Sequence, residues 1–182
     1  MGQYFKPAIL AKNKKTVLKW FLSHSYGKAD KGFCGLKLME HSWMKNRFVG
    51  AVEKFLLGNP QHIVWAGDYA AECKDRKTNI YGRCKDGTEV SPSEIPPQVV
   101  KAKYIVNHTK KEFIDKSKVP NVNGWRIHPL PLMTCEGCGQ GGGDFFGKDK
   151  QRLIGSWARN LISVESRVPK GFKEVLFDLV EE

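Results

Sequence analysis

The 182-residue sequence contains no apolar run that approaches the roughly 20 residues needed to span a membrane, which excludes a helical membrane protein. Residues 1–15 lack the order of a secretory signal peptide, in which a basic region precedes an apolar core and a small-residue cleavage site. Only five cysteines are present, and in a cytosolic protein these are more often thiols or metal ligands than disulfides. We therefore expect a soluble cytoplasmic protein with no membrane partner.

Acidic residues are scarce relative to basic ones, since 19 Asp and Glu face 30 Lys and Arg to give a formal net charge of +11. Residues 1–60 carry 11 of the basic residues and only three acidic ones, so this third supplies +8. Such a field favours an anionic partner: nucleic acid, a nucleotide or an acidic host protein. The alternative is a soluble lysine-rich surface, because Arg, the better phosphate ligand, is rare here. The candidate contacts in this third are Lys14, Lys15, Lys45 and Arg47.

Apolar content of 41% and this length suit a single domain over residues 1–182, because the proline-rich connector 91–98 is too short to separate two. Helical spacing predicts one N-terminal helix over residues 14–25 and a second from Ser42 to a stop at Gly58. The rest of the chain has mostly the patterns of strands, so we expect an α+β fold with a mainly antiparallel sheet. The predicted strands are residues 3–11 (an edge strand because of Pro7), 62–66, 79–81, 103–106, 110–116, 158–165 and 172–181.

The most unusual stretch is WRIHPLPLMTCEGCGQGGGDFFG, residues 125–147, where a proline-stiffened run predicted to be extended leads into a glycine-rich loop. Its glycines match the dinucleotide-binding pattern G-x-G-x-x-G, but no apolar helix follows and the chain is not βαβ. It also lacks the Gly-Lys-Ser/Thr of a Walker loop. Two interpretations remain, a binding loop whose backbone N–H groups meet an anion or a planar ligand, and a flexible loop ordered by a partner. The candidate binding residues are Gly139, Gly141, Gly142 and Gly143.

Four cysteines have a spacing that could hold zinc. Cys135 and Cys138 form a C-x-x-C pair, and with Cys73 and Cys84 they could close a tetrahedral zinc site in a zinc-stabilised interaction module. A zinc ribbon normally has two such pairs, whereas the earlier half here is a looser C-x10-C. Ordinary free thiols are the favoured alternative.

Acidic and imidazole side chains follow several predicted strands. Asp68 and His108 each come after a buried strand, His128 lies in the proline-stiffened run, and Asp144 ends the glycine loop. If those strands are neighbours, the four side chains could converge to bind a divalent metal or to act as an acid–base pair, as in a metal-dependent phosphoester hydrolase. IVWAGDY and YIVNH resemble motifs of calcineurin-like metallophosphoesterases, but the early Asp-x-His and late His-x-His motifs are missing. A turn-capping role is the alternative for Asp68.

Aromatic residues occur among the positive charges. Exposed Trp or Tyr beside Lys or Arg can stack nucleic-acid bases, although most large aromatic residues belong in a core. The aromatic residues in question are Tyr4, Phe5, Trp20, Tyr26, Phe33, Trp43, Tyr104, Trp125 and Trp157.

Five segments together resemble a family of proteins encoded by tailed bacteriophages that has no established activity. They are GLKLMEHSWMKNRFVGAVEKFL, IVWAGDYA, YIVNHTKKEFIDKS, WRIHPLPLMTCEGCGQGGGDFFG and GSWARNLISVE, and the resemblance covers most of residues 36–165. It implies a small soluble protein made in a bacterial cytoplasm and acting on host machinery, including its defence proteins. We therefore expect an accessory binding protein with an anionic partner, with the hydrolase and the zinc module as the alternatives.

Overall fold

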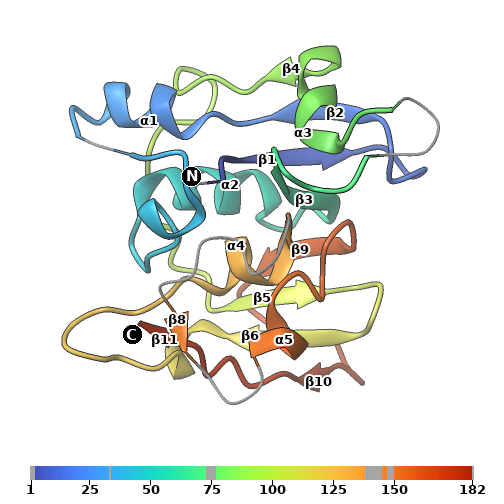
Figure 1. Cartoon of the computed structure of the whole chain (residues 1–182). Coiled ribbons are helices and arrows are strands. Elements are labelled where there is room, and N and C mark those ends of the chain that lie inside the picture. Colours follow the sequence, from blue (N-terminus) through green and yellow to red (C-terminus); the bar gives the residue numbers. More distant parts are fainter. Residues whose placement is uncertain (1–2, 33, 73–76, 138–144, 147–149, 182) are drawn as a thin grey trace.

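The computed structural model describes residues 3–32, 34–72, 77–137, 145–146 and 150–181. These residues form an α+β fold in which short helices flank a mixed sheet of nine strands (Figure 1). The strand order is β10-β6-β5-β9-β3-β1-β2-β4, with β7 paired to β3, and β8 and β11 form a separate pair. Over these described ranges, no helix has the length and apolar character that crossing a membrane requires.

The bounds of the elements are as follows. The strands are β1 (Phe5–Leu10), β2 (Val17–Trp20), β3 (Gln61–Gly67), β4 (Thr88–Glu89), β5 (Tyr104–Asn107), β6 (Glu112–Asp115), β7 (Cys135–Glu136), β8 (Phe145–Phe146), β9 (Leu161–Glu165), β10 (Lys173–Glu174) and β11 (Val180–Glu181). The helices are α1 (Ser23–Ala29), α2 (Arg47–Leu56), α3 (Ile80–Arg83), α4 (Pro129–Thr134) and α5 (Lys150–Leu153), with 3₁₀ turns η1 (Leu38–Glu40), η2 (Cys84–Asp86) and η3 (Lys116–Lys118).

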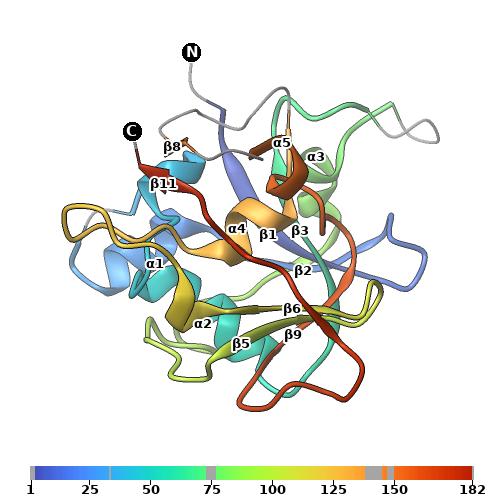
Figure 2. The same ribbon diagram turned by 90° about the horizontal axis from the view of Figure 1, so that it is seen from below.

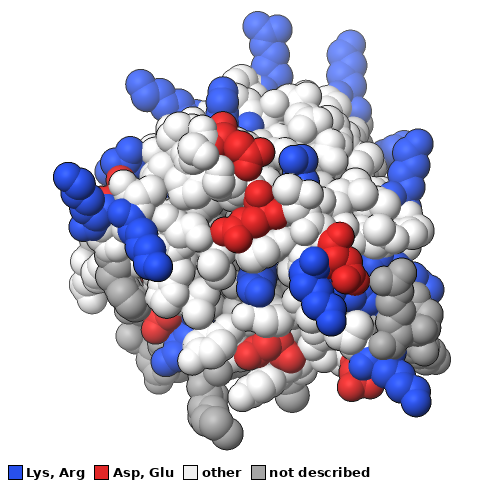
Figure 3. Space-filling model, turned by 90° about the horizontal axis from the view of Figure 1, so that it is seen from above, with Lys and Arg blue, Asp and Glu red and all other residues white. Residues whose placement is uncertain are grey.

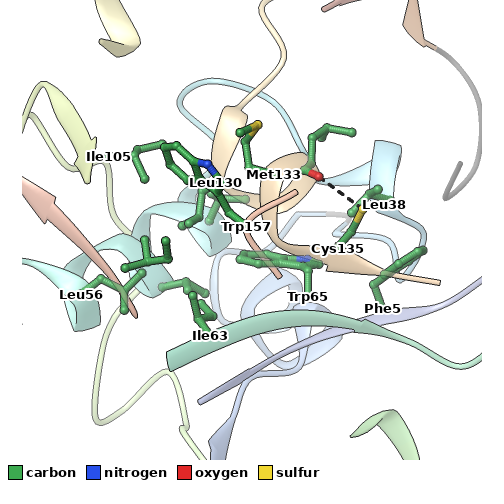
Figure 4. Packing of buried hydrophobic residues seen from close by; sticks show 14 of the residues in the cluster. Phe5, Leu38, Leu56, Ile63, Trp65, Ile105, Leu130, Met133, Cys135 and Trp157 are labelled. Atoms are coloured by element: carbon green, nitrogen blue, oxygen red, sulfur yellow. Dashed lines mark hydrogen bonds between the residues drawn. The ribbon is translucent and has the colours of Figure 1, made fainter. Parts of the chain in front are cut away.

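Strands β1 and β3 form the centre of the sheet and bury both of their faces. They pair antiparallel from Phe5↔Gly67 to Leu10↔His62, and successive side chains point to opposite faces. One face packs against α2 and α4 in the first apolar cluster, which contains Trp65 of β3 together with Leu56, Leu130 and Met133 (Figure 4). The other face forms the second apolar cluster with α3 and η2. That cluster consists of Ala8, Leu10, Val17, Val64, Ala66, Ile80 and Cys84.

The α+β class and the buried central strand are confirmed, but the prediction of a mainly antiparallel sheet is wrong. The pairs β2–β4, β3–β7 and β6–β10 are parallel, so the sheet is mixed. Each of these pairs joins a strand of only two residues to a partner far away in the sequence. Such short strands have no alternation pattern to read, and parallel pairing depends on long connections that local patterns do not report.

The first of the two predicted N-terminal helices is also wrong, because residues 17–20 form strand β2. The side chain of Asn13 accepts hydrogen bonds from the N–H groups of Lys15 and Thr16, at 3.0 Å each. Lys14 adopts a left-handed backbone with φ of 57°, so the chain turns back and β2 pairs with β1. Val17 is buried while Leu18 is 48% exposed, which is the alternation of a strand.

The second predicted helix exists as α2 but begins later than expected. Asn46, rather than Ser42, caps its start by accepting hydrogen bonds from the N–H groups of Phe48 and Val49. The predicted stop is confirmed, since Gly58 follows the helix with φ of 60°. Residues 79–81, predicted as a strand, instead enter α3, whose start Asn79 caps through Gly82 N–H.

Two predictions that rested on proline need correction. Strand β1 is not an edge strand, because it lies between β3 and β2. The carbonyl of Pro7 accepts a hydrogen bond from Phe21 N–H (3.0 Å), so its nitrogen, which has no N–H to donate, faces Phe21 just beyond the end of β2 and not the ladder with β3. Residues 129–134, predicted to be extended, form α4, because Pro129 occupies the first helical position, where a missing N–H costs nothing.

Candidate binding site

An exposed tryptophan lies at a tight turn in the segment between η3 and α4. Val122 and Trp125 exchange backbone hydrogen bonds of 2.9 and 2.8 Å, and the two residues between them, Asn123 and Gly124, have φ of 51° and 87°. Two consecutive positive φ angles and a two-residue loop define a type I′ turn, which Asn-Gly favours strongly. This rigid turn presents Trp125 with 54% of its surface exposed.

The segment before α2 lies beside this turn and supplies a second tryptophan. Trp43 pairs with Ile127 in an antiparallel bridge, and Met44 N–H donates to the carbonyl of Arg126 at 2.8 Å. The rings of Trp43 and Trp125 are in contact, with centroids 5.0 Å apart and planes at 57°. Figures 1 and 2 both show the gold-coloured segment between β6 and α4 projecting at one end of the molecule.

The two tryptophans line an open pocket of about 350 Å³. This volume falls within the range of small-ligand sites. Among the lining side chains, Trp43, Met44 and Trp125 are apolar or aromatic, while Lys45, Asn121 and Arg126 are polar or basic. We call these residues, with Gly124, the tryptophan pocket.

In the part of the chain that the structure describes, the basic side chains of the tryptophan pocket have no acidic partner. Over the described residues, no carboxylate lies within ion-pair distance of Lys45 or Arg126. Arg126 instead donates to backbone carbonyls, through Nη2 to Lys116 at 2.7 Å and through Nε to Val119 at 3.2 Å. These bonds fix the guanidinium without neutralising its charge. Lys45 is exposed and has a left-handed backbone with φ of 71°, a conformation that is rare outside glycine.

This combination suits a planar anionic ligand. A ring can stack on the open face of Trp125, while Lys45 and Arg126 attract a negative charge beside it. A ring cannot enter between the two tryptophans, because that would need parallel planes about 7 Å apart, twice the 3.4 Å rise of stacked bases. The site is therefore a one-sided stacking platform.

Three buried ionisable side chains lie next to the tryptophan pocket. Glu53 of α2, Lys116 of η3 and His128 are 3%, 6% and 2% exposed, and we call them the buried charge cluster. The Nζ of Lys116 donates to Oε1 of Glu53 at 2.5 Å, and His128 Nε2 lies 3.3 Å from the same oxygen. Burial raises the pKa of the Glu53 carboxyl, but the contacts with His128 and Lys116 outweigh burial and place the pKa below its ordinary value.

The hydrogen bonds of His128 determine which ring nitrogen carries its proton. His128 caps α4, because its Nδ1 accepts a hydrogen bond from Leu130 N–H at 3.2 Å. A nitrogen that accepts carries no proton, so the proton of the neutral ring is on Nε2 and points toward Glu53. In this tautomer the imidazole satisfies both contacts, and Lys116 gives Glu53 a cationic partner.

The structure separates Asp68 from His108. Strand β9 lies between β3 and β5, and Asn107 and Gln61 both pair with Ile162, so these two residues are level on the sheet. Asp68 lies beyond the far end of β3, roughly 20 Å farther along at about 3.3 Å per residue. The condition for their convergence, that the two strands be neighbours, is not met.

Each of the predicted catalytic residues that the structure describes has a local partner. An oxygen of Asp68 accepts the N–H of Tyr4 at 3.0 Å, so this carboxylate caps the start of β1. His108 Nε2 lies 2.8 Å from the hydroxyl of Ser163, which is fully buried. His128 belongs to the buried charge cluster, and Asp144 lies outside the described residues, as do Gly139, Gly141, Gly142 and Gly143 of the predicted binding loop.

Two of the four cysteines predicted to bind zinc are described, and they lie apart. Cys84 belongs to the second apolar cluster and Cys135 to the first, on opposite faces of the sheet. Burial raises the pKa of each thiol to about 12, which disfavours the thiolate that zinc binds. Cys73 and Cys138 lie outside the described residues, and the residues that the structure does describe contain no group of three or more potential metal ligands.

The basic residues predicted as contacts do not form one surface. Lys14 and Lys15 lie in the β1–β2 turn, at the opposite end of the molecule from the turn that carries Trp125 (Figures 1 and 2). Arg47 pairs with Asp30 at 2.8 Å, which leaves Lys45 as the one predicted lysine or arginine in the tryptophan pocket. From above, Lys and Arg side chains are spread around the outline of the molecule with acidic residues between them (Figure 3).

Trp43 and Trp125 are among the aromatic residues near positive charge in the sequence, but no sequence pattern pairs them. No sequence pattern indicates Asn121 and Arg126, or Glu53 and Lys116 of the buried charge cluster. The one local signal was Asn123-Gly124, whose preference for a type I′ turn predicts that the next residue is presented at a hairpin. No protein-family model, curated protein or solved structure matches this chain.

Proposed function

We propose that this protein binds single-stranded nucleic acid at the tryptophan pocket. One base stacks on the open face of Trp125, and the neighbouring phosphates lie near Lys45 and Arg126. The observation that carries the proposal is the exposed Trp125, held rigidly by its turn beside two cations that have no carboxylate partner in the described chain. The open face of an exposed tryptophan can stack with a base, and base stacking on an aromatic ring stabilises binding by about 1–3 kcal/mol.

The geometry favours a single strand over a duplex or a free nucleotide. Bases within a duplex are stacked on both faces and cannot cover Trp125, whereas a single strand offers free faces. A site for a free nucleotide normally encloses most of its ligand, but Trp125 is 54% exposed at a turn. Stacking accepts every base, so we expect little sequence preference.

The charge of the whole protein and the bacteriophage resemblance fit this proposal. A net charge of +11 attracts nucleic acid over a distance and raises the association rate at low salt. In the context that the resemblance implies, the ligand would be single-stranded DNA or RNA in a bacterial host. The hydrolase and zinc-module alternatives have no comparable observation in their favour.

The test measures anisotropy of a labelled oligothymidylate of about 12 nucleotides, a length that covers one binding site. Trp125→Ala should weaken binding about tenfold or more, the loss of one stacked base. Tyr69→Ala is the matched control, because Tyr69 is 50% exposed, lies next to Asp68 beyond β3 and should not affect binding. Equal affinity of the Trp125→Ala variant and the parent protein would contradict the proposal.

Salt and competitor experiments identify the ligand. Two phosphate contacts predict that log K falls with log salt at a slope of about −1.4 for a single strand. Unlabelled oligothymidylate should displace the probe, whereas duplex DNA of the same length and thymidine monophosphate should compete weakly. A duplex that competes as well as the single strand would rule out stacking on Trp125 as the binding mode.

A further inference from the structure

The buried charge cluster is connected by hydrogen bonds to both walls of the tryptophan pocket. The N–H of His128 donates to the carbonyl of Ser42 at 2.8 Å, which ties the start of α4 to the segment that carries Trp43. The carbonyl of Lys116 accepts the Nη2 of Arg126 at 2.7 Å. The side chains of His128 and Lys116 then meet on one oxygen of Glu53 in α2. One carboxylate thus joins three elements, α2, η3 and α4, that adjoin the two segments lining the pocket.

Stability alone does not account for this cluster. Removing charged groups from water is costly, and apolar residues of similar volume in place of a buried ion pair often leave stability unchanged or raise it. What charges add is directionality, because each hydrogen bond requires a particular distance and angle, whereas apolar contacts tolerate small shifts. The large first apolar cluster around α2 and α4 could bury these three positions without charges.

We infer that Glu53, Lys116 and His128 are positioning residues that set the spacing of the two tryptophans. Fixed lengths in the Glu53–Lys116 and Glu53–His128 contacts hold η3 and the start of α4 against α2. The Trp125 turn and the Trp43 segment are attached to these elements, so their rings are held in contact. The link to ligand binding rests on the proposed function, but the positioning of the rings does not.

The decisive variant removes the charges of Glu53 and Lys116 but keeps the approximate volumes of both side chains. In the double variant Glu53→Gln/Lys116→Met, the amide oxygen of the introduced glutamine can still accept the Nε2 proton of His128, and the methionine fills the lysine volume. Urea unfolding should show stability close to that of the parent protein. The pocket should nevertheless loosen, which a purely structural role does not predict.

The readout is ¹⁹F NMR of protein labelled with 5-fluorotryptophan, without nucleic acid. The resonances of Trp43 and Trp125 are assigned with Trp43→Phe and Trp125→Phe. In the double variant both should broaden or move toward the position of free fluorotryptophan, while those of Trp65 and Trp157 stay in place. Unchanged Trp43 and Trp125 resonances would overturn the inference.

A control variant tests whether general destabilisation could move the resonances, and a second variant replaces the first if that one does not fold. Val64→Ala makes a cavity in the second apolar cluster, and it should lower stability while leaving the resonances of Trp43 and Trp125 unchanged. Displacement of both resonances by this remote change would also overturn the inference. If the double variant does not fold, His128→Asn serves instead, because asparagine can still cap α4 but is too short to reach Glu53. It should displace the same two resonances.

Binding is measured separately, so that the two proposals can fail independently. If the protein binds oligothymidylate, the double variant should bind it roughly tenfold more weakly, within the range for residues that act on a site without touching its ligand. If the parent protein does not bind oligothymidylate, the proposed function fails. The displaced resonances would still support the positioning role.

Discussion

Tryptophan and lysine meet in two regions of this protein, with different outcomes. On the β1–β2 side, Lys6 Nζ lies 4.7 Å from the ring centroid of Trp20 and 4.3 Å from that of Tyr81, so the chain's own lysine covers both rings. In the tryptophan pocket, the rings of Trp43 and Trp125 contact each other, and no described cation lies over either ring. In the first region the protein's own lysine covers the aromatic rings, whereas the second region leaves an aromatic face open to a ligand.

The support beneath the two regions differs as well. The second apolar cluster lies under Trp20 and Tyr81 and holds them by apolar packing. The tryptophan pocket is attached to the buried charge cluster through His128 and Lys116. A binding surface thus needs more than aromatic residues and positive charge, because its basic side chains must also be held away from its aromatic rings.

The largest expected effect comes from breaking the support beneath the tryptophan pocket. Glu53→Ala leaves the Lys116 ammonium buried without a counterion, and it should lower the free energy of unfolding by about 3–5 kcal/mol. Val64→Ala, beneath Trp20, should cost about 2 kcal/mol because it only leaves a cavity. Urea unfolding measures both. A smaller loss for Glu53→Ala than for Val64→Ala would remove this difference between the two regions.

Acid should lower the free energy of unfolding through His41, which is buried in the core close in sequence to Trp43. His41 is fully buried, its Nε2 accepts the indole N–H of Trp65 at 2.9 Å, and burial lowers its pKa to about 4. In the unfolded chain its pKa is about 6.5, so between these values only the unfolded state takes up the proton. Stability is therefore full above pH 6.5 and falls as the pH drops toward 4, with a loss of about 2 kcal/mol at pH 5.

Urea unfolding at pH 7 and pH 5 measures this loss. His41→Gln can keep a hydrogen bond to Trp65 without titrating, so its stability should change less over the same interval. A parent protein that is equally stable at both pH values would show that His41 takes up no extra proton on unfolding.

A smaller effect is expected from the turn that presents Trp125. Gly124 has φ of 87° and open space around it, so Gly124→Ala introduces backbone strain of about 1 kcal/mol without a clash. Gly171 is the matched control, with φ of 80° and the same open space. Both variants should lose similar stability in urea, but only Gly124→Ala should weaken binding of the labelled oligothymidylate. Equal binding by the two variants would show that the turn does not position Trp125.

The smallest effects are expected when Lys6 and Lys45 are each replaced by glutamine and the two variants are compared. Lys6→Gln and Lys45→Gln remove the same charge, so the change in overall attraction is matched. Lys6→Gln should lower stability by about 0.5–1 kcal/mol, the value of an exposed cation–π contact, and leave oligothymidylate binding nearly unchanged. Lys45→Gln should leave stability unchanged and reduce the salt slope of binding by about 0.7. Reversed results would assign the nucleic-acid contact to the β1–β2 side.

Local signals predicted part of the fold correctly. The apolar run around Trp65 indicated a buried strand, and Gly58 marked the end of α2, because each depends on residues close in sequence. The helix predicted over residues 14–25 was wrong, because the turn at Asn13 and pairing with β1 outweighed a helix-like spacing of apolar residues. The prolines after His128 indicated extended chain, but a proline in the first turn of a helix is equally favourable.

The candidate site was less predictable than the fold. A spread of basic residues over 1–60 indicated an anionic partner but not a surface, because residues close in sequence, such as Lys15 and Lys45, lie in different regions. In the sequence, Glu53 looks like an ordinary acidic residue of an amphipathic helix. Its burial depends on Lys116, which reaches it from another element. Pairings of this kind join distant parts of the chain and leave no local pattern.

The amino-acid sequence alone accounts for the positive charge, the end of α2 at Gly58, the buried central strand and the turn at Asn123-Gly124, because composition and backbone preference act within a few residues. The tertiary structure decided which tryptophans are covered and which are open. Sheet order places Lys6 over Trp20, and the bridge between Trp43 and Ile127 brings Trp125 beside Trp43. Exposure of a ring depends on what the rest of the chain packs against it, so only the folded protein shows that Trp125 is available.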